Sequence, residues 1–171
     1  MVASGDVRRV ARGFYDVPGI NKLTGKLTAP DPREVLDALA RRGKVRILVD
    51  GITAANDLGL TTAVPARIEV LTDARLRSIK LGNLTLTFRC AAPSRLYWAG
   101  RPAMRVVQAL HWVKDLLPSD RGGIMLRLQR VLGDPDFGPA IREDLKDGLA
   151  AMPAWMQSFM RELLREASTT T

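Results

Sequence analysis

The carboxylates of Asp50, Glu69 and Asp73 have the spacing that comes nearest to a metal-dependent catalytic centre. A nuclease core of the restriction type places an aspartate before a strand that carries Glu-x-Lys, so that two carboxylates hold a divalent metal and the lysine assists the attacking water. In this sequence Leu71 occupies the lysine position, and Asp50 forms a turn pair with Gly51. We therefore expect Asp50 to be a turn residue, and a metal-dependent nuclease-like protein is the alternative.

The single histidine and the single cysteine add no catalytic pattern. His111 has no aspartate or serine at the spacing of a known motif, so we expect a structural or surface histidine. Cys90 alone cannot form an intramolecular disulfide or a cysteine-based zinc cluster, and we expect it to be a small buried apolar residue. The sequence also lacks a Walker-type phosphate loop and a dinucleotide fingerprint. We expect a protein that is not an enzyme, with no catalytic residue, no metal site and no cofactor.

Positive charge is the property that indicates a partner. Across 171 residues, 26 lysines and arginines exceed 18 aspartates and glutamates, which gives a formal net charge of +8. Such a balance favours nucleic acid, an acidic protein surface or an anionic lipid. The first residues lack the apolar core of a signal peptide, so we expect none, and no apolar run is long enough to cross a membrane. We therefore expect a cytoplasmic protein without a membrane partner.

Three arginines lie in a segment that predicts a β-hairpin. The short runs 7–11 and 14–17 are joined by a loop that contains Gly13, a pattern typical of a hairpin. On such a hairpin arginine side chains can reach phosphates or enter the minor groove of DNA. The alternative is a solvated strand edge whose charges prevent aggregation. The candidate DNA-binding residues are Arg8, Arg9 and Arg12.

The remaining pattern predicts an α+β fold. A helix is expected to begin at the capping Asp31 and Pro32 and to end at Gly43. Runs of alternating or continuous apolar residues predict a mostly antiparallel sheet, with a bulge near 77–78 and a turn at 82–83. The expected strands are 45–49, 67–72, 75–81 and 84–89.

From Pro102 onward the apolar residues recur at helical spacing. Four amphipathic helices are expected, with Leu117 on the apolar face of the first and Pro153 at the start of the last. Short links between them favour a helical bundle. We expect the three tryptophans and the apolar face of the last helix to belong to the core; these residues are Trp98, Trp112, Trp155, Met156, Phe159 and Met160.

These elements are arranged around the segment 51–73. Small and apolar residues at helical spacing predict a short helix that ends at Gly59, and Pro65 favours an extended link to the strand that follows. The small side chains indicate a helix packed closely against a sheet. The residues that define this pattern are Ala54, Ala55 and Leu58.

Two segments together resemble the AbiEi-type antitoxin family of type IV toxin–antitoxin systems. The segment 8–18 is similar to the basic R-R-x-x-R-G-x-Y segment that ends the family's N-terminal winged helix-turn-helix. Because only residues 1–6 precede Val7 and the hairpin, we expect a member that lacks most of that winged helix-turn-helix. The second segment matches the family's hallmark G-x-T-A-A-N-x-L-G-L-T-T-x-V-P, followed by a strand ending in L-T. Its matching residues are Gly51, Thr53, Ala54, Ala55, Asn56, Leu58, Gly59, Leu60, Thr61, Thr62, Val64, Pro65, Leu71 and Thr72.

The resemblance implies an α+β protein in three parts: a wing-like basic hairpin and loop at 1–30, an antitoxin-like core at 31–100 and a C-terminal helical region at 101–171. It also implies an antitoxin in phage defence that regulates transcription of its own operon and counters a nucleotidyltransferase toxin. The Gly-Ser pair and spaced aspartates of such toxins are missing here. The cognate toxin is the expected functional partner, and DNA is expected to bind weakly in this form. The further alternative is an adaptor that binds protein alone.

Overall fold

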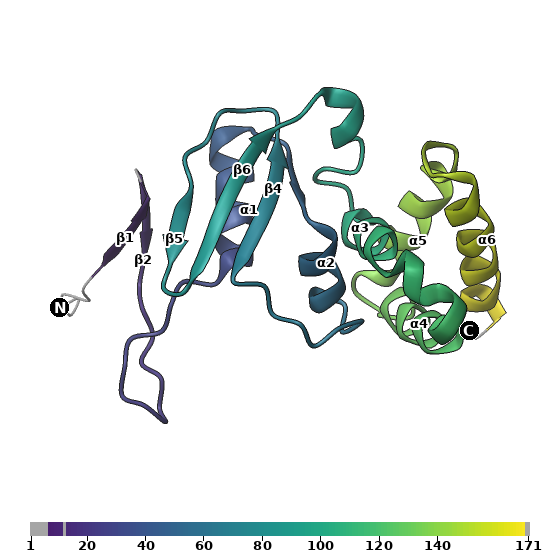
Figure 1. Ribbon diagram of the computed structural model, residues 1–171, viewed down its shortest axis with the longest axis horizontal. Coiled ribbons are helices and arrows are strands. Elements are labelled where there is room, and N and C mark those ends of the chain that lie inside the picture. Colours follow the sequence, from purple (N-terminus) through teal and green to yellow (C-terminus); the bar gives the residue numbers. More distant parts are fainter. Residues whose placement is uncertain (1–6, 12, 170–171) are drawn as a thin grey trace.

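The computed structural model describes residues 7–11 and 13–169 of the chain. Along the longest axis of the molecule, a hairpin lies at one end, a mixed sheet in the middle and a group of helices at the other end (Figure 1). The predicted α+β class, with a mostly antiparallel sheet followed by a C-terminal helical region, is confirmed. None of the helices within the described ranges combines the length and the apolar character needed to span a bilayer.

The predicted N-terminal hairpin is present. Strands β1 (Arg8–Ala11) and β2 (Phe14–Asp16) pair antiparallel, and Gly13 adopts the left-handed backbone that the connecting turn requires, with φ of 79°. The hairpin lies beside the central sheet, where β1 contacts strand β5 (Ile79–Leu81) (Figure 1). A long loop, residues 17–31, then leads from β2 to the first helix.

The central sheet has the strand order β3-β4-β6-β5. Two of its neighbouring pairs are antiparallel, whereas β4 and β6 run parallel. The expected bulge near 77–78 is wrong, because β5 begins only at Ile79 and pairs with β6 in unbroken register. Cys90, expected to be buried, is exposed at the end of the sheet. The other strands are β3 (Ile47–Val49), β4 (Arg67–Thr72) and β6 (Leu84–Cys90).

Helix α1 (Pro32–Gly43) crosses one face of this sheet (Figure 1). Its start is as predicted, because the Oδ1 atom of Asp31 accepts the backbone N–H of Arg33 at 2.8 Å. Its end differs from the prediction. Gly43 is still helical, and the left-handed residue is Lys44, with φ of 49°. A Cβ atom on Gly43 would come within 2.8 Å of a methyl group of Val45, so any larger residue there would force that side chain to shift.

The short helix α2 (Gly51–Asp57) joins the sheet to the helical region. It packs mainly against helix α3 (Met104–Val113), not against the sheet as the sequence suggested. A Cβ atom on Gly51 would lie 2.8 Å from the carbonyl oxygen of Gln108 and 2.8 Å from the Cβ atom of Trp112. The small residues of this segment therefore serve a close helix–helix contact.

The rest of the helical region contains α4 (Leu117–Leu132), α5 (Gly138–Asp147) and α6 (Ala154–Thr169). Leu117, predicted to share the apolar face of α3, instead begins α4, because α3 ends four residues earlier. Trp112 is also not a core residue, since it is exposed on α3. The three apolar residues predicted for the core on the last helix are buried; they are Met156, Phe159 and Met160. Short 3-10 helices complete the chain at η1 (Pro93–Leu96), η2 (Lys114–Leu116) and η3 (Leu149–Ala151).

Candidate functional site

The guanidinium group of Arg8 forms hydrogen bonds within the hairpin and to the loop that follows it. Its Nη2 atom donates to the Oδ2 atom of Asp16 at 2.6 Å and to the backbone carbonyl of Thr28 at 2.8 Å. These contacts tie β1 to β2 and to the loop that precedes α1. Arg8 is therefore a residue that holds the hairpin in place, and part of its positive charge is already neutralised.

Of the other two candidate DNA-binding arginines, Arg9 lies within the described hairpin. Arg9 lies on the same strand as Arg8 and is exposed, with its backbone paired to Tyr15 across the hairpin. Arg12 lies outside the described residues. Arg9 is thus an exposed arginine of the described hairpin, a position from which a guanidinium group can reach a phosphate.

The three carboxylates considered for metal binding have separate structural roles. Asp50 caps α2, because its two oxygens accept the backbone N–H groups of Thr53 and Glu69, each at 2.8 Å. The carboxylate of Asp73 accepts the N–H of Arg46 at 2.9 Å. Glu69 forms an ion pair with a nearby arginine of β6. In the ranges that the structure describes, no three His, Cys, Asp or Glu side chains gather where they could hold a metal ion.

His111 lies on the exposed side of α3 and contacts an aromatic ring of α6. Its imidazole packs edge-on against Trp155, with 6.1 Å between the ring centres. Partial burial, and then the positive charge of Lys114, lower the pKa of His111 below its ordinary value. The neutral imidazole is thus favoured in the folded protein, as expected for a packed surface histidine.

The segment that resembles the antitoxin hallmark is held together largely by its own hydrogen bonds. The side-chain amide of Asn56 donates to the carbonyl groups of Thr61 and Ala63 at 3.3 Å and 3.1 Å, which fixes the loop after α2. Gly59 has φ of 68°, as predicted for the end of this helix. Thr53 is buried, and its Oγ1 atom has no hydrogen-bond partner among the described residues.

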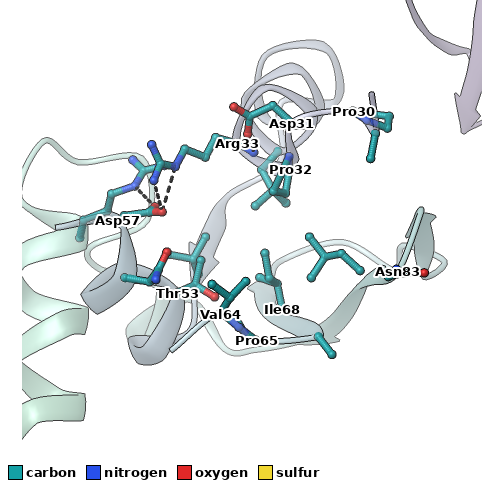
Figure 2. Close-up of a pocket in the computed structure, with 17 residues that line it drawn as sticks. Pro30, Asp31, Pro32, Arg33, Thr53, Asp57, Val64, Pro65, Ile68 and Asn83 are labelled. Carbon is teal, nitrogen blue, oxygen red and sulfur yellow. Dashed lines mark hydrogen bonds and ion pairs between the residues drawn. The ribbon is translucent and has the colours of Figure 1, made fainter. Parts of the chain in front are cut away.

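This segment forms one wall of a cleft of about 720 Å³, which we call the motif cleft. The opposite wall comes from the start of α1, and the floor from the starts of β4 and β6 (Figure 2). Most of the lining is apolar, and Val64 stands at the rim with 82% of its surface exposed. The lining residues are Ala29, Pro30, Asp31, Pro32, Arg33, Leu36, Val49, Thr53, Asn56, Asp57, Val64, Pro65, Ala66, Ile68, Asn83, Leu84 and Arg105.

A buried carboxylate between two arginines closes one end of the motif cleft. The Oδ1 atom of Asp57 accepts from Nε and Nη2 of Arg33 at 2.9 Å and 2.6 Å, and its Oδ2 atom accepts from Nε of Arg105 at 2.9 Å (Figure 2). The Asp57 side chain is only 9% exposed. Sequence reasoning missed this cluster, because its members lie 24 and 48 residues apart and no local pattern connects them.

The same three charged residues also border a second, larger cleft of about 1090 Å³. This cleft runs between α1, α2 and the helices α3 to α5, and the exposed ring of Phe137 lies along it. Arg127 and Arg130 contribute further positive charge, and Asp134 and Asp136 contribute negative charge. The Arg33–Asp57–Arg105 cluster therefore stands where two clefts meet.

Comparison with protein families matches residues 2–120 to DUF6088, a family of unknown function. The chain belongs to this family. The matched range includes the hairpin, the segment 51–73 and every residue that lines the motif cleft. It ends within α4, so α5 and α6 lie outside it. No curated protein and no solved structure matches the chain.

Proposed function

We propose that this DUF6088 protein is an antitoxin-like, non-enzymatic protein of a type IV toxin–antitoxin system in phage defence. Its functional partner is a nucleotidyltransferase toxin, and its hairpin contacts DNA for regulation of its own operon. The observation that carries the proposal is the joint occurrence, in one chain and in the expected order, of the basic segment 8–18 and the segment 51–65. Both segments resemble those of AbiEi-type antitoxins.

The structural roles of the acidic residues support a non-enzymatic protein. Asp50, Glu69 and Asp73 each serve a separate cap, ion pair or turn, and Leu71 stands where a nuclease would need lysine. Purified protein is expected to leave DNA, RNA and nucleotides intact with magnesium or manganese. Metal-dependent cleavage that disappears in the Glu69→Ala variant would contradict this part of the proposal.

Neutralisation of a toxin is the direct test. A nucleotidyltransferase encoded beside this chain is expected to arrest growth when it is induced alone, and co-expression of the full chain is expected to restore growth. The matched variants are Gly51→Val, which places a larger side chain in the tight contact with α3, and Gly122→Ala, which meets no atom within 4 Å. Rescue should be lost with the first and kept with the second. Unchanged growth arrest in the presence of the soluble wild-type chain would refute the antitoxin role.

DNA binding is expected to be weak and dependent on salt. Phosphate contacts from a hairpin carry little sequence information, so the dissociation constant should be around 10⁻⁴–10⁻⁶ M at physiological salt. The candidate contributors are Arg8, Arg9 and Arg12, of which Arg8 also pairs with Asp16. Three phosphate contacts give a slope of about −3 in log K against log salt. The assay is a titration of labelled promoter DNA and scrambled DNA at several salt concentrations.

Substitution of the arginines separates the possible outcomes of this titration. The triple variant Arg8→Ala/Arg9→Ala/Arg12→Ala is expected to lose most of the salt-dependent slope, whereas Arg161→Ala on α6 should keep it. Tight binding that prefers the promoter sequence would show that an element other than the hairpin reads bases. An equal slope in both variants would remove the hairpin from the interface.

A specific observation favours a protein-only adaptor as the second candidate. The loop 17–31 carries exposed apolar side chains, among them Leu23 at 96% exposure, beside Lys22 and Lys26. Exposed apolar residues flanked by positive charge suit an acidic protein surface. The absence of any salt-dependent DNA binding, together with rescue from the toxin, would favour this candidate over a DNA-binding regulator.

A further inference from the structure

Arg105 presents an unused hydrogen-bonding edge at the end of the motif cleft. Its Nε atom is bound to Asp57, and no hydrogen bond or ion pair among the described residues involves its Nη1 or Nη2 atoms. The side chain is 33% exposed and borders both clefts. Because the guanidinium group is planar, the bond from Nε to Asp57 also fixes the direction of the remaining donors.

The charge of this cluster is not balanced within itself. One carboxylate, that of Asp57, is shared between the guanidinium groups of Arg33 and Arg105. The other acid that lines the cleft, Asp31, is engaged at the start of α1, where the helix dipole already favours negative charge. A planar, two-oxygen anion such as a carboxylate, or a phosphate group, matches the free Nη edge of Arg105.

The interior of the motif cleft suits an apolar body. Buried aliphatic side chains form its inner surface, and exposed Val64 extends that surface to the rim (Figure 2). A volume of about 720 Å³ lies within the range of roughly 300–1,000 Å³ that is usual for small-molecule sites. The buried apolar lining residues are Leu36, Val49 and Ile68.

We propose that the motif cleft is a binding site for a small amphipathic organic anion. Its apolar body lies between the start of α1 and the segment 51–65, and its carboxylate or phosphate group binds the Nη edge of Arg105. Asp57 is a positioning residue that holds the guanidinium group in place. This site is separate from the hairpin to which DNA binding is assigned.

The first test uses 1-anilinonaphthalene-8-sulfonate, a fluorescent aromatic anion, as the probe with the full chain. Saturable binding at one site is expected. Arg105→Gln should raise the dissociation constant by about tenfold or more, as expected for loss of one charge-assisted hydrogen bond. Val64→Asp should do the same through charge repulsion at an exposed position that the fold does not need. Arg161→Gln, on the remote helix α6, is the matched control and should bind like the wild type.

Because this dye also binds loosely packed states, each variant must retain the wild-type near-UV circular dichroism and urea midpoint. Equal dye affinity in the wild type, Arg105→Gln and Val64→Asp would overturn the proposal. Val64→Asp keeps the test decisive if Arg105→Gln fails to fold. Absence of saturable binding to the folded wild type would also overturn it.

The second test identifies the anionic group by competition. Displacement of the dye by nucleoside 5′-monophosphates, with inorganic phosphate inactive, assigns a phosphate-bearing ligand. Displacement by 1-naphthoate assigns a carboxylate ligand. Failure of both classes to displace the dye would overturn the assignment to an organic carboxylate or phosphate.

Discussion

Replacement of glycine by alanine is expected to change the free energy of unfolding in opposite directions at Gly51 and at Gly122. Gly51 begins α2 at its contact with α3, where a new Cβ atom would lie 2.8 Å from a backbone carbonyl oxygen and 2.8 Å from the Cβ atom of Trp112. Neither neighbour is the far end of a flexible side chain. Gly122 lies in α4, and a Cβ atom there would meet nothing within 4 Å.

The size of each change in the free energy of unfolding follows from these surroundings. Overpacking a tight contact costs about 1–3 kcal/mol, and the gain in helix propensity is small at the first residue of a short helix. We therefore expect Gly51→Ala to lower the free energy of unfolding by about 1–2 kcal/mol. Replacing glycine by alanine inside an exposed helix is favourable by roughly 0.5–1 kcal/mol. Gly122 lies in the first turn after the non-helical Asp120 that breaks α4, where this gain is smaller, so Gly122→Ala is expected to raise the free energy of unfolding by at most about 0.5 kcal/mol.

Urea unfolding followed by far-UV circular dichroism measures both effects. The midpoint should fall for Gly51→Ala and rise for Gly122→Ala, with slopes that match the wild type. A second probe, tryptophan fluorescence, checks that the transitions coincide, as a two-state comparison requires. An unchanged or raised midpoint in Gly51→Ala would refute the close approach of α2 to α3, and with it the structural reason for glycine at the start of this segment.

Three further predictions concern the core, the histidine and a buried carboxylate. Leu86→Ala should cost about 2–5 kcal/mol in urea melts because this side chain is fully buried, whereas Phe88→Ala should cost less because its ring is only partly buried. His111 has a lowered pKa in the folded state, so the unfolded state binds the proton more readily, and stability should fall as pH drops below about 6.5. His111→Gln should flatten that dependence, and Lys114→Met should raise the pKa of His111 only in part, as read by NMR titration. Asp144→Ala should lower the free energy of unfolding by about 2–3 kcal/mol. The substitution removes the acceptor of the Arg101 guanidinium group and of the backbone N–H of Ala103 at the start of α3.

Local signals in the sequence predicted the elements whose causes are local. The cap at Asp31, the left-handed glycine at Gly59 and the turn at Gly82 each act over a few residues, and the structure has all three where they were expected. The helical period after Pro102 likewise predicted α3 to α6. These features depend on backbone geometry and apolar spacing, which a sequence records directly.

The errors arose where tertiary packing overrides a local pattern. Gly43 was expected to leave the helix because glycine tolerates a positive φ, but here it makes room for Val45, and Lys44 takes the left-handed conformation. Trp112 was expected in the core by residue type, yet its place on α3 leaves it exposed. In both cases the decisive neighbour or face is set by the fold, so residue preference alone gave the wrong answer.

The motif cleft shows why the candidate ligand site was beyond sequence reasoning. Its floor exists because β4 and β6 run parallel, with Ile68 opposite Leu86, which brings the start of β6 beside the start of β4. An antiparallel pairing of the same two strands would place Leu84 near Thr72, at the far end of the sheet from α2. The sequence predicted the strands but not which of them would be parallel neighbours, because the β5–β6 hairpin inserts β6 next to β4. The meeting of Asp57 with its two arginines depends in turn on the start of α1 and on α3 both reaching the end of α2, so the site follows from topology and not from any single motif.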